Sequence, residues 1–121
     1  MGYKLSWEPR GVVLRFSGRV TISDILNASN AYQGNRWYDE LLYVIADYSQ
    51  ITDCGARPND IDDVWAVDYG AKRSNNKIKK AIVTTSPDVV ALARRYAIAP
   101  DPAFPVEVFG KEADARAWLT E

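Results

Sequence analysis

The sequence predicts one α/β domain over residues 1–121, built on a mixed β-sheet with elements in the order β-β-α-β-α-β-α-β-α. Three observations predict it: a hairpin-like start, uninterrupted apolar runs in the middle, and amphipathic segments between them. A hairpin followed by alternating helices and strands is typical of a sheet with parallel crossovers. A chain of 121 residues suits one core rather than two.

The first third of the chain indicates a hairpin and a helix. Residues 3–8 alternate apolar and polar side chains, residues 9–11 form a turn, and residues 11–18 are apolar and β-branched. These features predict two antiparallel strands. Thr21 or Ser23 can then cap a helix through its side-chain oxygen, and the helix is expected to end at Gly34.

The middle of the chain indicates a central strand. Residues 41–46 are continuously apolar and end at Asp47. Such a run predicts a strand buried on both faces, in the middle of a layered sheet. Residues 48–58 are predicted to form a loop. Asn59 or Asp60 is predicted to cap the next helix, which runs to residue 73.

The last third repeats the alternation. Residues 79–84 predict another buried strand, and Ser86 followed by Pro87 is a strong helix start. Prolines in the segment 100–105 exclude a helix there. Residues 106–109 predict a short strand, and residues 112–119 predict a closing helix.

The composition excludes several kinds of function. The chain has 15 basic and 16 acidic residues, so it lacks the basic excess of a nucleic-acid-binding protein. It has no His and one Cys, which excludes His-based catalysis, an internal disulfide and a cysteine-built metal site. We therefore expect no enzyme activity, no cofactor, no metal and no nucleic-acid partner. No run approaches the roughly 20 apolar residues of a membrane span, and no targeting signal is visible, which favours the cytoplasm.

The candidate site follows the central strand. Ligands of open α/β sheets bind at the carboxyl ends of strands, and helix N-termini attract anions. Position alone therefore makes this segment a candidate ligand or partner site, aimed at a crevice. Its residues are Asp47, Ser49, Asp53, Cys54, Gly55 and Asp60. The alternative is that Asp47 and Ser49 only fix the loop through side-chain to backbone hydrogen bonds.

Cys54 and the charged segments each have an ordinary explanation beside a functional one. The Cys54 thiol would be reactive only if a cation such as Arg57 or a helix dipole lowered its pKa; otherwise it is a bystander. An enzyme using Asp53 with Cys54 is the weakest hypothesis, because no base orients the pair. Asp60, Asp62, Asp63 and Asp68 form an acidic cluster, and favourable charge at a helix N-terminus explains the first three without a metal. The basic residues are expected to form a solvated edge, with an acidic partner, a phosphate or an anionic bilayer surface as the alternative. They are Lys72, Arg73, Lys77, Lys79 and Lys80.

Two segments carry a resemblance to a known family. Residues 47–55, Asp-Tyr-Ser-Gln-Ile-Thr-Asp-Cys-Gly, are similar to the STAS segment in which Asp-hydrophobic-Ser leads to Asp-Ser-Ser-Gly. Residues 106–119, a strand ending in Phe and then an acidic-alanine helix with Trp-Leu, resemble the tails of SpoIIAA-like proteins. The chain thus resembles the SpoIIAA-like fold of STAS domains and the wider STAS/SEC14-like group of small bacterial proteins. Cys54 departs from that pattern, because the STAS switch protein has a phosphorylatable serine there.

The resemblance implies a non-enzymatic protein-interaction or regulatory module, acting through residues 49–59 and the helix from Asp60 to Arg73. The alternative is a binder of a small apolar or lipid-like ligand, held in a pocket between sheet and helices. Four Trp and seven Tyr could line such a pocket, although Trp65 and Trp118 are expected in the core. If aromatics such as Trp37 and Tyr69 are exposed together, they mark a contact surface. A homodimer through the edge strand of the N-terminal hairpin is also open.

Overall fold

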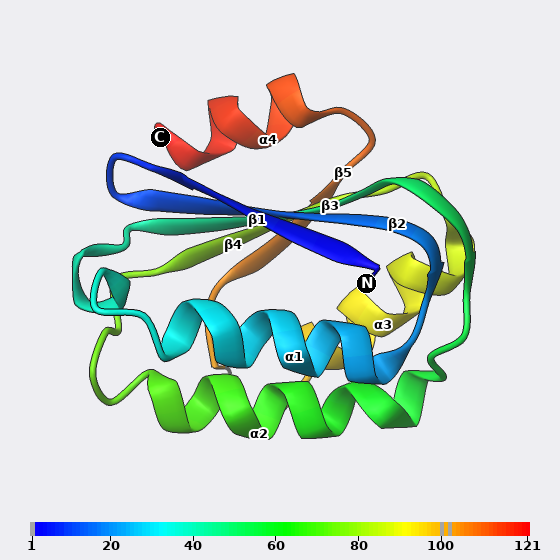
Figure 1. Cartoon of the computed structure of the whole chain (residues 1–121), viewed down its shortest axis with the longest axis horizontal. Coiled ribbons are helices and arrows are strands. Elements are labelled where there is room, and N and C mark those ends of the chain that lie inside the picture. The colour runs from blue at the N-terminus through cyan, green and yellow to red at the C-terminus, as the bar shows by residue number, and fades with distance from the viewer. Residues whose placement is uncertain (1, 100, 102) are drawn as a thin grey trace.

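The computed structural model describes residues 2–99, 101 and 103–121. Five strands form one sheet in the spatial order β1-β2-β3-β4-β5 (Figure 1). The elements are β1 (Tyr3–Glu8), β2 (Gly11–Val20), α1 (Ile22–Gln33), η1 (Tyr38–Glu40), β3 (Tyr43–Cys54), η2 (Pro58–Asp60), α2 (Ile61–Ala71), β4 (Lys79–Val83), α3 (Pro87–Ala97), β5 (Val106–Phe109) and α4 (Glu112–Leu119).

The sheet has the predicted topology. β1 and β2 pair antiparallel, and β2, β3, β4 and β5 follow one another in parallel. Helices α1, α2 and α3 cover one face, and α4 covers the other. The element order and the central place of β3 are therefore confirmed.

Side-chain caps explain where two helices begin. Thr21 Oγ1 accepts the Asp24 N–H at 3.2 Å, and the Asp24 carboxylate accepts the Thr21 N–H at 2.9 Å. This reciprocal pair satisfies two amides that have no partner within the first turn. Ser86 caps α3 through a single hydrogen bond, which its hydroxyl oxygen accepts from the Val89 N–H. Asp60 acts one turn earlier than predicted, because its carboxylate accepts the Arg57 N–H at 2.8 Å and so caps η2.

The predicted loop over residues 48–58 is wrong for its first half. β3 continues to Cys54, and its last residues pair with β2 alone, beyond the end of β4. Tyr48 remains buried and stacks on Phe16, with ring centroids 4.5 Å apart. The strand also begins at Tyr43 rather than at residue 41. Hydrogen bonds with β2 hold these polar residues in a strand. The local pattern of apolar and polar residues does not predict that strand.

Two apolar cores lie on the two faces of the sheet. The larger lies under α1, α2 and α3 and includes Phe16, Tyr32 and Phe104. The smaller lies under α4 and contains Val13, Ile45, Ala81, Val83 and Ala115. The continuous apolar run of β3 follows from this, because successive residues enter opposite cores.

The two tryptophans expected in the core lie at its margin. Trp65 is half-buried, stacks on Tyr69, and donates its indole N–H to the Asp101 carbonyl at 3.0 Å. Trp118 is half-buried against Phe109 and beneath the Lys79 ammonium. In both cases a polar contact holds the ring at the protein surface. Among the described residues, no helix has the length and apolar character needed to cross a bilayer.

Candidate functional site

Asp47 is a buried acid on the α4 face of the sheet. Its carboxylate accepts a hydrogen bond from the Arg15 guanidinium at 2.7 Å and another from the Ser49 N–H at 2.9 Å. The second bond is the local side-chain to backbone contact that the structural alternative predicted. The Asp47 side chain is 7% exposed, so little of it is available to a partner.

Asp47 begins a chain of ion pairs that fastens α4 to the sheet. Arg15 also reaches Glu112 at 3.1 Å, and Arg116 binds both Glu112 at 2.9 Å and Glu8 at 2.7 Å. Hydrogen bonds from Arg116 lower the pKa of Glu8 and of Glu112, and both acids raise the pKa of Arg116. The only local sign of this network in the sequence is the i, i+4 spacing of Glu112 and Arg116, which is that of a helical ion pair.

Beyond the end of β4, residues 17–20 of β2 and 50–54 of β3 pair with each other alone and form a two-stranded extension, the β2–β3 ribbon. Three candidate residues are exposed along or beside it: Ser49, Asp53 and Gly55. Asp53 pairs with Arg19 at 2.6 Å, and the Gly55 N–H donates to the Val20 carbonyl at 2.7 Å. A side chain at position 55 would meet the Arg19 guanidinium, with its Cβ 2.8 Å away. These residues form a polar surface strip, in which backbone pairing with β2 holds Asp53 and Gly55 and the Asp47 carboxylate holds Ser49.

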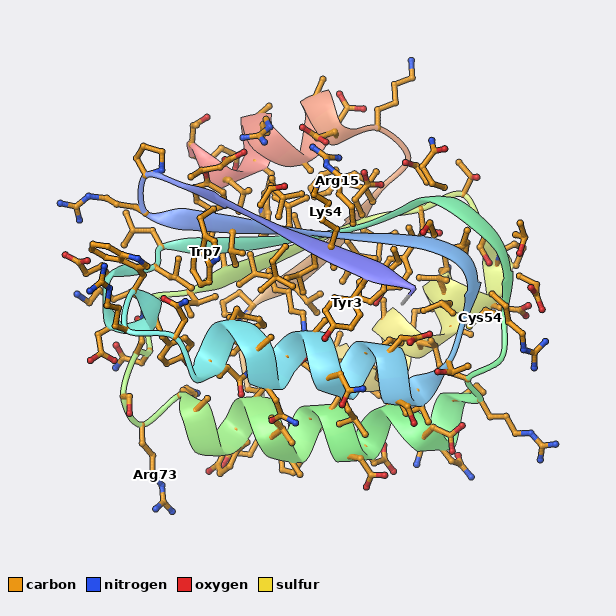
Figure 2. All side chains as sticks on the ribbon, viewed as in Figure 1. Tyr3, Lys4, Trp7, Arg15, Cys54 and Arg73 are labelled. Atoms are coloured by element: carbon orange, nitrogen blue, oxygen red, sulfur yellow. The ribbon has the colours of Figure 1, made fainter. Side chains whose placement is uncertain are left out.

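The surroundings of Cys54 disfavour its thiolate form. It is half-buried at the end of β3, and its thiol lies 3.6 Å from the Ala56 carbonyl (Figure 2). Burial is the largest influence and raises the pKa of the thiol. A thiolate is the nucleophilic form of cysteine, so this environment works against the Asp53–Cys54 enzyme hypothesis. Among the described residues, no cluster of His, Cys, Asp or Glu could hold a metal ion.

The candidate residues form an edge rather than the walls of a crevice. A crevice opens in a parallel sheet where the strand order reverses, but strands β2 to β5 follow chain order. Their connecting helices α1, α2 and α3 all lie on one face. Asp47 points to the opposite face, and Asp60 belongs to η2 beside the helices. The structure therefore brings Asp47 and Ser49 together, and it places Asp60 in η2 at the start of α2.

A buried ion pair between Asp68 and Lys80 lies on the helix face of the sheet. The Asp68 carboxylate accepts the Lys80 ammonium at 2.9 Å, the Tyr96 hydroxyl at 2.7 Å and the Gln33 amide at 2.6 Å. The side chains of Asp68 and Lys80 are 0% and 7% exposed. The prediction of a solvated edge is wrong for Lys80, because its ammonium is buried against the Asp68 carboxylate.

The pocket expected between sheet and helices is small. The cavity there is lined by residues such as Tyr48, Ile82 and Tyr96 and has a volume of about 30 Å³. That is room for about one water molecule, whereas sites for small organic ligands begin near 300 Å³. The described interior does not support the lipid-like ligand.

Comparisons with known proteins agree on the fold. No protein-family model matches the sequence, and a search of curated proteins finds no match. Among solved structures, one similar chain is the anti-sigma factor antagonist SpoIIAA in its unphosphorylated form, which is 11% identical. The two structures align with a TM-score of 0.61, and the alignment covers 98% of this chain and 97% of SpoIIAA. An anti-sigma factor antagonist from Mycobacterium paratuberculosis is 14% identical with a TM-score of 0.65, covering 98% and 93%.

A third similar structure is an uncharacterised protein of the DUF3478 family from Shewanella loihica PV-4, described as having a SpoIIAA-like fold. It is 13% identical with a TM-score of 0.55, covering 97% of this chain and 91% of its own. The resemblance predicted from residues 47–55 and 106–119 is therefore confirmed at the level of the fold, and the chain has the SpoIIAA-like fold of STAS domains.

Proposed function

We propose that this protein is a non-enzymatic regulatory module that binds a protein partner through the exposed end of the β2–β3 ribbon and the neighbouring helix α2. The supporting observation is the likeness of nearly the whole chain to two anti-sigma factor antagonists.

The chemistry of the ribbon end fits binding better than catalysis. Ser49, Asp53 and Gly55 are exposed, and backbone pairing with β2 holds Asp53 and Gly55 while the Asp47 side chain holds the Ser49 N–H, so a partner would meet an ordered polar surface. Burial raises the pKa of the Cys54 thiol, which disfavours the nucleophilic thiolate. A serine-type phosphorylation cycle is not part of this proposal, since a thiol stands where the switch protein has its serine. A cytoplasmic location and the lack of a nucleic-acid partner remain predictions from composition.

The test is affinity capture from a lysate of the cells that encode the protein, with a charge reversal at the ribbon end. Asp53→Lys should lose the partner recovered with the wild-type chain, because the substitution reverses the charge of the proposed surface. Asp39→Lys is the matched control, since Asp39 is equally acidic and exposed but lies in η1. Equal loss with both variants, or a wild-type chain that recovers no specific partner, would reject the proposal.

A further inference from the structure

We propose that the outer edge of β1 pairs with β1 of a second copy of this chain, giving a two-fold symmetric dimer with a continuous sheet centred on Ser6. This inference does not depend on the partner proposed above. It rests on the unpaired backbone of the edge, on the charges along β1, and on the exposed apolar groups beside it.

The backbone of β1 offers hydrogen-bonding groups without partners in the described structure. The Ser17 N–H donates to the Gly2 carbonyl at 2.9 Å, which makes Gly2 and Ser17 a hydrogen-bonded pair. Hydrogen-bonded and non-hydrogen-bonded pairs alternate along antiparallel strands. The N–H and C=O groups of Leu5 and Trp7 therefore point away from β2. No described strand lies on that side of β1.

The side chains select one register. When Ser6 faces its own copy, Leu5 stands opposite Trp7 and Lys4 stands opposite Glu8. Leu5 and Trp7 then exchange backbone hydrogen bonds as an apolar pair, which matches the outward direction of their N–H and C=O groups. Lys4 and Glu8 form an ion pair twice, once on each side of the axis. In a register centred on Leu5, Lys4 would face Ser6 and this complementarity would be lost.

Both charged groups are available for that contact. Lys4 is exposed on the α4 side of β1, and Tyr3 lies on the α1 side (Figure 2). The Glu8 carboxylate accepts Tyr43 and one Arg116 nitrogen at Oε1, and a second Arg116 nitrogen at Oε2. A carboxylate has about four acceptor positions. Oε2 therefore retains one position for the Lys4 ammonium of the second copy.

An apolar groove extends the same edge. Trp7 and Trp37 are 38% and 48% exposed. They line an open groove of about 440 Å³ at the hairpin end, together with Pro9, Arg10 and Leu41. In the proposed register Tyr3 of the second copy stands opposite Pro9, beside this groove and on the same face as Trp7. Exposed aromatic side chains adjoining an unpaired edge are typical of an interface core.

Helix α1 leaves room for the second copy. Asp24 marks the side of α1 nearest β1, because its carboxylate lies against Gly2. Asn27 and Ala31 share that side, three and seven residues later, and both are exposed. Asn27 and Ala31 are small and uncharged, and the Asp24 carboxylate on this side already accepts hydrogen bonds from the Thr21 N–H and hydroxyl.

The first experiment measures the mass of the purified chain by sedimentation velocity over a range of concentrations. The wild type should dimerise, and Lys4→Glu should raise the dimer dissociation constant about tenfold, because two attractive pairs become repulsive. Lys77→Glu is the matched control, since Lys77 is exposed away from β1, and it should dimerise like the wild type. A chain that is monomeric throughout, or a dimer unaffected by Lys4→Glu, overturns the proposal.

Mixing separates a lost contact from a damaged fold. Lys4→Glu and Glu8→Lys should each dimerise weakly alone, whereas an equimolar mixture should form mixed dimers, since each altered charge then faces its opposite. Native mass spectrometry distinguishes the species when one variant is isotope-labelled. Weak dimerisation that mixing does not restore contradicts the Lys4–Glu8 pairing.

The register itself is tested by a disulfide in a Cys54→Ser background. Two Ser6 residues across the axis form a non-hydrogen-bonded pair, with Cα atoms about 4.5 Å apart, within the range for a disulfide. Ser6→Cys should therefore yield a covalent dimer under mild oxidation. Leu5→Cys should not, because two Leu5 residues are diagonal neighbours about 7–8 Å apart. Efficient cross-linking only with Leu5→Cys shows a different register and overturns the proposed one.

Discussion

The two faces of the sheet each carry a cluster of ion pairs, and the clusters differ in their access to water. On the helix face, Asp68 and Lys80 are nearly inaccessible. On the α4 face, the side chains of Arg15 and Arg116 are 44% and 39% exposed. One cluster lies inside the larger core, and the other bridges the surface between α4 and the first two strands.

This difference in solvation predicts different energetics. Burying a charge costs several kcal/mol, which only a close partner and further hydrogen bonds offset. Asp68 has both, since Lys80, Tyr96 and Gln33 all donate to it. The groups of the α4 network are more exposed and lost less hydration when the network formed, so each ion pair contributes less to the free energy of unfolding. That contribution depends on pH, because the network lowers the pKa of Glu8 and of Glu112. The helix-face pair should therefore be fragile to the loss of one partner, and the α4 network should be sensitive to acid.

The largest expected effect is that of removing Lys80. Lys80→Met should lower the free energy of unfolding by about 3 to 5 kcal/mol, because it leaves the Asp68 charge buried without a cation. Urea denaturation at neutral pH measures the change. Lys79→Met is the matched control one residue away. The Lys79 ammonium lies over Trp118 on the α4 face, and its loss should cost about 1 kcal/mol or less.

A double substitution sharpens this prediction. Asp68→Leu combined with Lys80→Met removes both charges, so it should be more stable than Lys80→Met alone, although Tyr96 loses its acceptor. If the double variant is less stable than the single one, or if Lys79→Met and Lys80→Met cost the same, the two faces do not differ as proposed.

An intermediate effect is expected from Arg116, with a pH dependence of defined sign. In the folded protein, hydrogen bonds from Arg116 lower the pKa of Glu8 and of Glu112 from about 4.5. A lowered pKa stabilises the folded state at pH values above the unfolded pKa, and this stabilisation disappears as pH falls through the folded pKa. Arg116→Leu should therefore cost about 1 to 2 kcal/mol at pH 7, and the cost should shrink below about pH 4.5.

Urea denaturation at pH 7, 4.5 and 3 measures this dependence. Arg94→Leu is the control, because Arg94 is exposed on α3, away from the network. Its small effect should stay constant across the three pH values. A cost of Arg116→Leu that is unchanged at pH 3 would show that the arginine acts through packing rather than through its two carboxylates.

Local patterns predicted most of the fold. Thr21 and Ser86 were recognisable as caps, and the apolar run before Asp47 identified the central strand, because each depends on neighbours in sequence. The end of β3 was missed, since residues 48–54 are held by pairing with β2 rather than by their own apolar periodicity. Strand pairing of this kind is a tertiary effect.

The ion pairs were missed for the same reason. Asp68 followed an acidic helix start, and Lys80 ended a basic run, so both had the local pattern of solvated charges. They are adjacent only because β4 lies beneath α2, and no spacing in the sequence records that contact. The surface residues of the candidate site were found by position alone, and their role stays a prediction.

The smallest expected effect on stability is at the Arg19–Asp53 pair of the candidate site, which should contribute less to the free energy of unfolding than either group of ion pairs. Arg19 and Asp53 pair at 2.6 Å, but their side chains are 64% and 49% exposed. Such a pair contributes little in water, so Arg19→Ala should change the free energy of unfolding by less than about 0.5 kcal/mol in urea denaturation. A decrease of more than about 1 kcal/mol in the free energy of unfolding would show that this ion pair stabilises the fold. A negligible loss, together with loss of partner capture by Asp53→Lys, would show that this edge can carry recognition without a cost in stability.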